Sequence, residues 1–351
     1  MIEPRLLVIG AGVSGLSCAR EYQRRGGRVT VLERARGVGG RCATRHVDGQ
    51  AVDLGCPFLH ARSPEFSCVL DELDPAGDLS GWPVRVREKR LACQPDAFVP
   101  ESRRLAPVGG VRSLPKHLAR DLDVRLECRV TGLRSEAGVV RALAEGGESF
   151  EAEHVVVALS LAQSLRLLEP LVDEWAGAES QLVRMRAVET VPVLTLIAGW
   201  RMDSPEPGFD VWHPMETTMI GAVIHDSAKR QSPRHRVLVV HARPSFSRRQ
   251  LDNDPGEWTA ELLWELGELL GEWAERPAWV QAHRWTSGRV RNADVLGRPA
   301  VFHPPTGGTI AVVGDVFGLT PGLEGAYMSG IAAGGMLAVL PESPPRGRRR
   351  S

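Results

Sequence analysis

Hydrophobic residues follow a similar pattern near the two ends of the chain. Residues 5–10 form a short apolar run, residues 13–26 have apolar positions at helical spacing, and residues 28–33 form a second apolar run. This β–α–β order predicts a parallel sheet. Residues 309–315 form another apolar run like the first one. The apolar segment 325–340 follows, and because it is shorter than a membrane span, it predicts a buried helix. The two ends of the chain are therefore expected to share one α/β domain.

The middle of the chain has the spacing of shorter strands that pair locally. Apolar runs separated by short turns predict an antiparallel insertion or hairpin, followed by a second block of strands. These runs lie at residues 124–133, 139–144, 150–159, 191–200, 219–226 and 236–244. A helix is then expected from Pro255 to about Trp273, with Asp254 as its N-cap and Glu257 three residues after the cap. We interpret the acidic face of this helix as a solvated surface over a core, rather than a surface for a partner.

The composition narrows the class of protein. The 351 residues include 43 basic and 43 acidic side chains, so the chain has no net charge that would attract nucleic acid or an anionic membrane. The six cysteines form no CxxC pair, which argues for reduced thiols and against both a disulfide framework and a zinc site. The first strand is not preceded by an export signal, so we expect a cytoplasmic protein, either a monomer or a homodimer.

A glycine-rich segment follows the first predicted strand and opens the first helix. Gly10, Gly12 and Gly15 have the spacing GxGxxG. Gly10 permits a tight turn, Gly12 lets a pyrophosphate approach the backbone, and Gly15 lets the helix pack closely on the strand. The helix N-terminus favours phosphate through its free N–H groups and its dipole. Glu33 ends the second strand, where a carboxylate can accept hydrogen bonds from a ribose diol, so a dinucleotide site is predicted.

Two further motifs indicate that the dinucleotide is FAD. Gly40 and Arg41 follow the second strand, a position typical of FAD-dependent oxidoreductases, and the guanidinium can fork onto a pyrophosphate. Gly314 and Asp315 end a late strand, and this carboxylate can accept a hydrogen bond from a ribityl hydroxyl. The helix that begins near Glu324 can direct its positive end at the flavin N1–C2=O group, which becomes negative on reduction. No cysteine lies near this second anchor, so the FAD is expected to be noncovalent.

From residue 5 to residue 340 the chain resembles the flavin-containing amine oxidase superfamily and, within it, the renalase-like family. The GxGxxG–Glu–GGR start and the Gly-Asp…Glu-Gly-Ala finish carry this resemblance. Residues 53–58 are similar to the family segment that passes beside the flavin. Further similar segments lie at residues 98–100, 108–115, 224–230, 239–246 and 284–290. The chain departs from the family at residues 56–57, where the family has Ala-Gln, and at residues 321–322, where bacterial members often carry an arginine.

The resemblance implies a two-domain architecture like that of amine oxidases and p-hydroxybenzoate hydroxylase, with a Rossmann-type FAD-binding domain and a mixed α+β substrate domain. The FAD-binding domain is expected at residues 1–60, 107–170 and 286–340. The substrate domain is expected at residues 61–106 and 171–285, and residues 341–351 are expected to form a disordered basic tail.

The motifs and the resemblance together predict the residues of the site. Cofactor contacts are expected from Gly10, Gly12, Val13, Ser14, Gly15, Glu33, Arg34, Gly40, Arg41, Gly55, Cys56, Pro57, Phe58, Val130, Gly314, Asp315, Leu323, Glu324, Gly325 and Ala326. Phe58 and His60 are candidates for the substrate face of the flavin, and Lys229 and Trp285 are candidates to bind a phosphate or to stack on the substrate. Ordinary packing is the alternative for each of these four side chains.

The resemblance also implies an activity. Renalase-like enzymes oxidise isomeric dihydronicotinamide dinucleotides by hydride transfer to flavin N5, and they return the electrons to O2 as H2O2. Such a reaction needs position and electrostatics rather than a general base, and the chain has no HExxH or GxSxG motif. Two alternatives stay open: an amine or alkene oxidase that acts on a small metabolite, and a flavin-bound scaffold or redox sensor without turnover. With only two tyrosines, a two-tyrosine cage for an amine is not expected.

Overall fold

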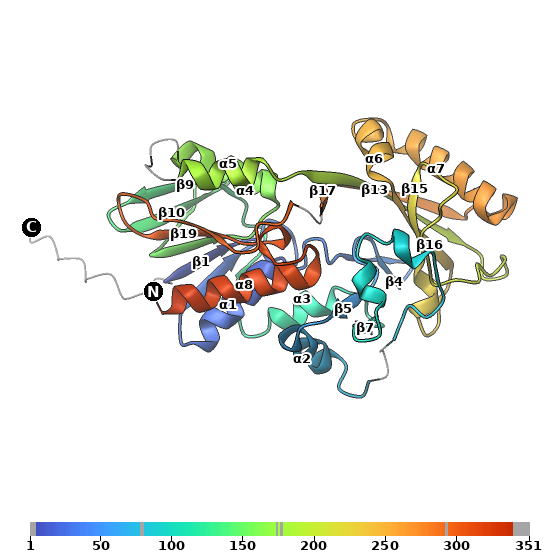
Figure 1. The fold of residues 1–351 in the computed structure, drawn as a ribbon, viewed down its shortest axis with the longest axis horizontal. Coiled ribbons are helices and arrows are strands. Elements are labelled where there is room, and N and C mark those ends of the chain that lie inside the picture. The colour runs from blue at the N-terminus through green and yellow to red at the C-terminus, as the bar shows by residue number, and fades with distance from the viewer. Residues whose placement is uncertain (1–4, 78–80, 173–174, 176–177, 292–293, 340–351) are drawn as a thin grey trace, which may run out of the picture.

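A computed structural model describes residues 5–77, 81–172, 175, 178–291 and 294–339, arranged in two lobes that each contain a large sheet (Figure 1). The predicted basic tail, residues 341–351, lies outside the described residues. Among the described helices, none has both the length and the apolar character needed to cross a membrane.

The first lobe contains a six-stranded sheet in the order β18-β19-β12-β1-β2-β8. Five of its strands run parallel and β18 is antiparallel to its neighbour. The strands are β1 (Leu6–Ile9), β2 (Val29–Leu32), β8 (Asp123–Arg125), β12 (His154–Val157), β18 (Ala300–Phe302) and β19 (Thr309–Val312). All residues of β1, β2, β12 and β19 are buried, as expected for parallel strands covered on both faces. The predicted β–α–β start and the late return of the chain to the same sheet are confirmed.

Two helices from opposite ends of the chain, α1 (Val13–Arg24) and α8 (Leu323–Ala338), pack side by side in this lobe (Figure 1). Small residues make this close approach possible. A Cβ at Gly330 would clash with the Ser14 carbonyl oxygen and the Ser17 hydroxyl, and a Cβ at Gly334 would come within 2.5 Å of the Cys18 carbonyl oxygen. The apolar segment predicted as a buried helix is therefore a helix that packs on the first one.

An antiparallel three-stranded sheet lies in the same lobe, formed by β9 (Val130–Glu136), β10 (Val139–Ala144) and β11 (Ser149–Ala152). The helices α4 (Leu161–Val172) and α5 (Glu179–Arg186) follow it. The predicted antiparallel insertion is present, but the expected single strand at residues 150–159 is wrong. The chain breaks at Glu153 because β12 leaves the insertion and enters the parallel sheet between β1 and β19. The run at residues 124–133 is likewise divided between β8 and β9.

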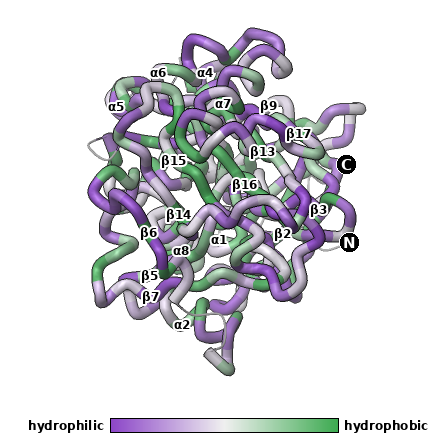
Figure 2. The backbone as a smooth tube through the Cα atoms, turned by 90° about the vertical axis from the view of Figure 1, so that its right-hand side faces the viewer, coloured by the Kyte–Doolittle hydropathy of each residue, from purple (hydrophilic) through white to green (hydrophobic). Residues whose placement is uncertain are grey.

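The second lobe contains a six-stranded sheet in the order β17-β13-β16-β15-β14-β6. Its strands are β6 (Val86–Arg87), β13 (Thr190–Trp200), β14 (Val211–Trp212), β15 (Ile220–His225), β16 (Arg236–Ala242) and β17 (Trp279–Val290). Figure 2 shows β13, β15 and β16 as hydrophobic segments in the middle of the molecule. The long strands β13 and β17 pair along most of their length and run between the two lobes (Figure 1). The sequence predicted β13, β15 and β16, but it did not predict β17.

Helices α6 (Pro244–Gln250) and α7 (Pro255–Leu270) pack on this second sheet. The Asp254 side chain accepts a hydrogen bond from the backbone N–H of Gly256, so the predicted N-cap is confirmed. Trp258, Leu262 and Leu266 are fully buried against the sheet. The helix ends before the predicted Trp273, because Gly271 has φ +100° and a 3₁₀ turn follows.

Smaller elements connect the lobes. A hairpin of β3 (Thr44–Val47) and β4 (Gln50–Asp53) and a pair of β5 (Leu59–Ala61) and β7 (Arg103–Leu105) lie beside α2 (Pro64–Leu73) and α3 (Ser113–Leu118). The residue boundaries of the two domains stay a prediction.

Candidate functional site

A large cavity lies where the two lobes meet, with a volume of about 990 Å³. Its wall includes the end of β1, the start of α1, residues on all the long strands of the second sheet, and the start of α8. This volume is at the upper end of the range of small-molecule sites, about 300–1,000 Å³. The cavity can therefore hold an extended ligand that contacts both lobes.

Most of the predicted site residues meet in this cavity. Its wall includes Gly10, Gly12, Val13, Ser14, Glu33, Arg34, Gly40, Arg41, Gly55, Cys56, Pro57, Phe58, His60, Val130, Trp285, Gly314, Asp315, Leu323 and Ala326. These residues come from segments that are far apart in the sequence, so the fold brings the early glycine-rich segment and the late Gly314–Asp315 segment to one site.

The glycine-rich turn leaves room for a phosphate. Gly12 is the N-cap of α1, has no side chain to cap the helix, and an added Cβ would meet no atom within 4 Å. Gly10 has φ +106°, and an added Cβ would lie 2.6 Å from the Ala158 carbonyl oxygen. A Cβ at Gly15 would clash with the Gly10 carbonyl oxygen, so this glycine lets α1 pack against β1. The open space at Gly12, at the positive end of a helix, suits a pyrophosphate.

The carboxylate of Glu33 is held at the end of β2 by two backbone amides. Its Oε2 accepts from the Ala11 N–H at 2.8 Å and its Oε1 accepts from the Ala35 N–H at 2.9 Å. These two hydrogen bonds orient the carboxylate in the cavity wall, and each oxygen keeps a second lone pair. This geometry fits the predicted acceptance of hydrogen bonds from a ribose diol.

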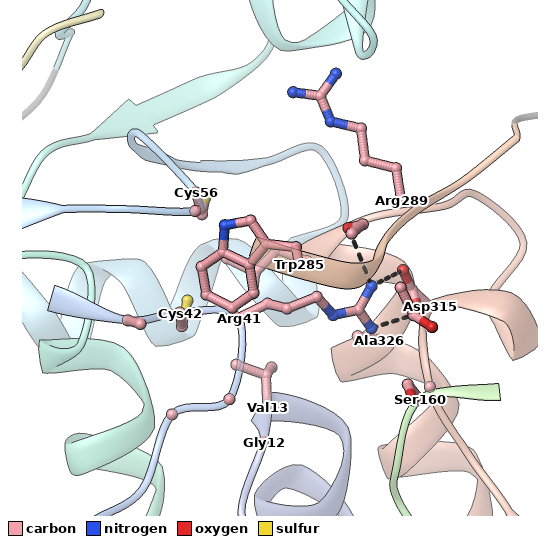
Figure 3. A pocket seen from close by; sticks show the side chains of 18 of the residues that line it. Gly12, Val13, Arg41, Cys42, Cys56, Ser160, Trp285, Arg289, Asp315 and Ala326 are labelled. Atoms are coloured by element: carbon pink, nitrogen blue, oxygen red, sulfur yellow. Dashed lines mark hydrogen bonds and ion pairs between the residues drawn. The ribbon is translucent and has the colours of Figure 1, made fainter. Parts of the chain in front are cut away.

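Arg41 and Asp315 form a bidentate ion pair across the cavity wall (Figure 3). The two guanidinium nitrogens Nη1 and Nη2 lie 2.7 Å from the two carboxylate oxygens, and Nη1 also donates to the Gly288 carbonyl oxygen at 3.5 Å. The charge of Asp315 is the main cause that raises the pKa of Arg41. The sequence had assigned these side chains to two different parts of the cofactor and had not predicted that they pair.

Trp285, Gly55 and the start of α8 form another part of the cavity wall. Gly55 packs against the indole of Trp285, since an added Cβ would lie 3.2 Å from its Cζ2 atom. The indole Nε1 of Trp285 is buried and has no hydrogen-bond partner in the structure. Leu323 and Ala326 add the first turn of α8 to this wall. A cavity wall with an unpartnered indole N–H and a helix N-terminus fits the isoalloxazine ring of a flavin.

Four predicted residues do not line the cavity: Gly15, Lys229, Glu324 and Gly325. Glu324 instead accepts hydrogen bonds from the backbone N–H groups of Arg62 and Ser63, so it fixes the start of α2 to the start of α8. A Cβ at Gly325 would clash with the Thr320 carbonyl oxygen, so its glycine serves the turn before α8.

Lys229, expected to reach a substrate, is buried in an ion cluster. Its Nζ lies 2.7 Å from Asp53 Oδ2 and 2.8 Å from Asp226 Oδ1, and it donates to the Pro57 carbonyl oxygen at 2.6 Å. Arg230 contacts the same two carboxylates at 2.9 and 3.0 Å. Burial alone would raise the pKa of Asp53, but Lys229 and Arg230 outweigh it and lower that pKa. The ammonium is therefore committed to structure, and it supports the segment next to the predicted flavin ring.

The far wall of the cavity contains polar residues that the sequence did not single out as ligands. His241 on β16 donates through Nε2 to the Leu54 carbonyl oxygen at 2.9 Å, and its Nδ1 accepts from Arg289 at 3.3 Å. Burial, followed by the charge of Arg289, lowers the pKa of His241 to about 3, so the ring is neutral. His213 also lines this wall, and its Nε2 is buried without a partner. The strands that carry His241 and Arg289 lie on either side of β13, so the sheet brings these side chains together, which a single sequence does not show.

Apolar and aromatic groups complete this wall. Phe58 and Phe98 pack with ring centroids 5.8 Å apart, and Val193, Val211 and Ile224 extend the surface along the second sheet. Burial lowers the pKa of His60, which therefore favours the neutral ring. Among the described residues there is no group of histidine, cysteine and acidic side chains that could hold a metal ion.

Comparison with known protein families gives two matches that together extend over most of the chain. The family described as NAD(P)-binding Rossmann-like domain matches residues 8–73. The family described as Flavin containing amine oxidoreductase matches residues 87–334.

Curated relatives match over a short segment. The probable polyamine oxidase 4 of Arabidopsis thaliana is 42% identical over 64 residues, 18% of this chain and 13% of the relative. A phytoene desaturase of Fusarium fujikuroi is 44% identical over 58 residues, 16% of this chain and 10% of the relative. The putrescine oxidase of Kocuria rosea is 38% identical over 72 residues, 20% of this chain and 15% of the relative. The matched segments thus span a small part of each relative.

Solved structures resemble the whole chain. A putative protoporphyrinogen oxidase from Exiguobacterium sp. 255-15 aligns with a TM-score of 0.68 at 16% identity, covering 97% of this chain and 99% of that chain. A putrescine oxidase with bound putrescine has a TM-score of 0.65 at 16% identity, with 96% and 99% covered. The cyclohexylamine oxidase from Brevibacterium oxydans IH-35A has a TM-score of 0.62 at 16% identity, with 96% and 99% covered. At this identity the likeness shows the shared two-domain fold.

Proposed function

Because this chain belongs to the flavin-containing amine oxidoreductase family and uses FAD, we propose that it oxidises a small anionic hydride donor, of the kind represented by isomeric dihydronicotinamide dinucleotides. When bound, FAD would supply the acceptor for the hydride of such a donor and would pass the electron pair to O2, which with one further proton gives H2O2. The proposal rests on the charge of the cavity wall.

The cavity has acidic side chains only near the predicted cofactor. Among the described residues that line it, Glu33 and Asp315 are the acids. Glu33 lies at the end of β2 beside the glycine-rich turn, and Asp315 is paired with Arg41. The substrate wall therefore presents no described carboxylate to balance a cationic diamine.

Arg289 contributes a positive charge to the substrate wall. Among the described residues, no carboxylate lies within ion-pair distance of its guanidinium, which donates to neutral His241. The hydrogen bond from His241 Nε2 to Leu54 leaves Nδ1 as an acceptor, so His241 orients the guanidinium without competing for its charge. An arginine held in this way is suited to a phosphate or carboxylate of the substrate.

The remaining residues of the wall position the donor. Phe58 and Phe98 exclude water from the space beside the predicted flavin ring, and the unpartnered Nε2 of His213 can bind a polar substituent. Hydride transfer from a dihydronicotinamide needs no general base, because the ring nitrogen of the donor drives the hydride out. Position and electrostatics are what these side chains supply.

A second candidate is the oxidation of a small amine. The paired rings of Phe58 and Phe98 form an apolar wall of the type that can accept an uncharged amine, and two of the relatives reported above are named as polyamine and putrescine oxidases. A basic cavity also favours the neutral form of an amine over the ammonium. The charge of Arg289 is therefore what separates the two candidates.

Anaerobic stopped-flow reduction of the bound flavin tests the proposal. Dihydronicotinamide dinucleotide isomers with the hydride at ring position 2 or 6 are expected to bleach the flavin rapidly, while putrescine and cyclohexylamine leave it oxidised. On readmission of O2, peroxide should appear in step with product. Rapid bleaching by the amines but not by the dinucleotides would replace the first candidate with the second.

An Arg289→Met variant provides the matched test of charge. Loss of a charge-assisted hydrogen bond to an anion costs about 1.5–3 kcal/mol, so KM for the dinucleotide should rise by about tenfold or more. Arg289→Lys keeps the charge and should retain part of the affinity. An unchanged KM in Arg289→Met would refute the role of the arginine.

A further inference from the structure

Two of the six cysteines lie together on the cavity wall where the flavin ring is expected. Cys42 is the second residue before β3, and Cys56 is the third residue after β4. The hairpin brings them together, because Thr44 is opposite Asp53 and the Leu54 N–H donates to the Ala43 carbonyl oxygen at 3.1 Å. Figure 3 shows both sulfur atoms at the edge of the cavity, on the same side of Trp285.

The two thiols interact directly. A side-chain hydrogen bond joins Cys42 and Cys56, and the Cys56 thiol also donates to the Phe58 carbonyl oxygen at 2.8 Å, which orients its side chain. The hydrogen bond with Cys42 is the main cause that lowers the pKa of Cys56, with burial acting against it, and the same hydrogen bond and burial raise the pKa of Cys42. Cys56 is therefore the thiol of the pair that loses its proton more readily, and its thiolate is the nucleophile.

The other cysteines lie in different surroundings. Cys18 is buried in α1, and burial raises its pKa to about 12. Cys68 and Cys93 are exposed, and Cys128 is half-buried with a pKa that burial raises. Among the described cysteines, only the Cys42–Cys56 pair combines a thiol–thiol hydrogen bond with a place on the flavin side of the cavity.

We infer that Cys42 and Cys56 form a redox-active dithiol, which hydrogen peroxide converts into a disulfide at the flavin site. The inference rests on the proposed function for its oxidant, since H2O2 is the product expected to form in this same cavity. It assigns a modification site to two residues that the proposed oxidation of substrate does not use.

The oxidation balances with one peroxide. The Cys56 thiolate attacks one oxygen of H2O2, the O–O bond breaks, and Cys56 becomes a sulfenic acid while hydroxide leaves. The sulfur of Cys42 then attacks the Cys56 sulfur, the S–O bond breaks, and the S–S bond forms. The two departing hydroxides take up the protons of the two thiols, so two thiols and one H2O2 give one disulfide and two waters.

The disulfide would tie the open end of the β3–β4 hairpin beside the flavin. Gly55 precedes Cys56, and a Cβ added to it would lie 2.5 Å from the Arg41 carbonyl oxygen and 3.2 Å from Trp285 Cζ2. Closing the S–S bond draws this backbone toward Cys42, so the contacts of Gly55 and Cys56 with the flavin ring change. Accumulated peroxide would in this way alter the absorbance of the bound flavin.

Peroxide added to the purified, flavin-loaded full chain tests the inference without any substrate. With one equivalent of H2O2 we expect the number of titratable thiols, measured after denaturation, to fall by two. The intact mass should fall by two hydrogens, and the peptides that contain Cys42 and Cys56 should be linked until dithiothreitol is added. A mass that gains oxygen, a link between other cysteines, or no change in thiol number would overturn the inference.

Serine variants keep the inference falsifiable. Cys42→Ser should leave a sulfenic acid on Cys56 that dimedone traps, and Cys56→Ser should consume almost no peroxide. Cys68→Ser is the matched control at an exposed cysteine, and in this variant Cys42 and Cys56 should still form a disulfide. Equal thiol loss in Cys56→Ser and in the original chain would contradict the assignment. Because peroxide is supplied directly, failure here is distinct from failure of the proposed function, which would appear as an absence of peroxide during turnover.

Discussion

Replacement of Lys229 by methionine tests the ion cluster that supports the flavin side of the cavity. The substitution keeps most of the side-chain volume and removes the ammonium that contacts Asp53, Asp226 and the Pro57 carbonyl oxygen. The side chains of the two acids and of Lys229 are at most 1% exposed. Water therefore cannot replace the lost ion pairs, and the cluster changes from neutral to a net charge of about −1.

The expected cost follows from this burial. Breaking a buried ion pair by removing one partner costs about 3–5 kcal/mol. Because Arg230 still contacts both carboxylates in this variant, we expect a cost near the lower end of that range. We expect a loss of about 3 kcal/mol in the free energy of unfolding. The exposed pair of Arg201 and Asp203 is the matched control, and Arg201→Met should leave stability unchanged.

Urea unfolding followed by tryptophan fluorescence measures this loss, at constant m-value. The pH dependence of the free energy of unfolding is a second test of the ion cluster. The lowered pKa of Asp53 means that its contribution to stability is present above its unfolded pKa of about 3.9 and is lost as the pH falls through the folded pKa. In Lys229→Met the Asp53 carboxylate loses one of its two cations and takes up a proton more readily, so the stability gap to the original chain should narrow on acidification. A loss below about 1 kcal/mol, or a gap that does not change with pH, would refute the reasoning.

Further predictions concern the buried histidine and the core. His241 has a pKa of about 3 in the fold and about 6.5 when unfolded, so stability should decline as the pH falls below the unfolded value, by about 2 kcal/mol at pH 5. Urea titrations at pH 7 and pH 5 should show a smaller decline in His241→Gln, and an equal decline would contradict the assignment. Leu266→Ala should cost about 2–5 kcal/mol in the free energy of unfolding, since the side chain is fully buried between α7 and the second sheet. Glu268→Gln, on the exposed face of the same helix, should change nothing, and a loss of stability there would show that this face is not merely solvated.

The parts of the fold and of the site that were predicted from the sequence rest on local sequence patterns. Gly10, Gly12 and Gly15 lie within one turn and its helix, so their spacing is sufficient to indicate their geometry. The late segment Gly314–Asp315 was identified because it also ends an apolar strand. The strand β12 was assigned to the wrong sheet, because a short apolar run has the same pattern in a hairpin and in the centre of a parallel sheet.

The features that could not be predicted from the sequence depend on contacts between residues that are far apart in the chain. Arg41 and Asp315 are 274 positions apart, and each was matched to a cofactor group because its partner was unknown. Lys229 was expected to face a substrate, since a lysine is rarely buried unless acids such as Asp53 surround it. The strand β17 was missed because most of its positions are half-buried and show no alternation. Arg289 and His241 meet only because their strands both pair with β13.

Titration of the apoprotein with FAD, compared with the Gly12→Val variant, tests the central claim most directly. Gly12 has φ −78° and ψ 177°, which any residue adopts, and open space at its Cβ, so valine should not affect folding. We expect the original chain to bind one FAD that is released intact on denaturation, and the variant to bind at least about tenfold more weakly, or about 1.4 kcal/mol. A folded, colourless chain that takes up no FAD, or a variant that binds it equally well, would contradict the claim.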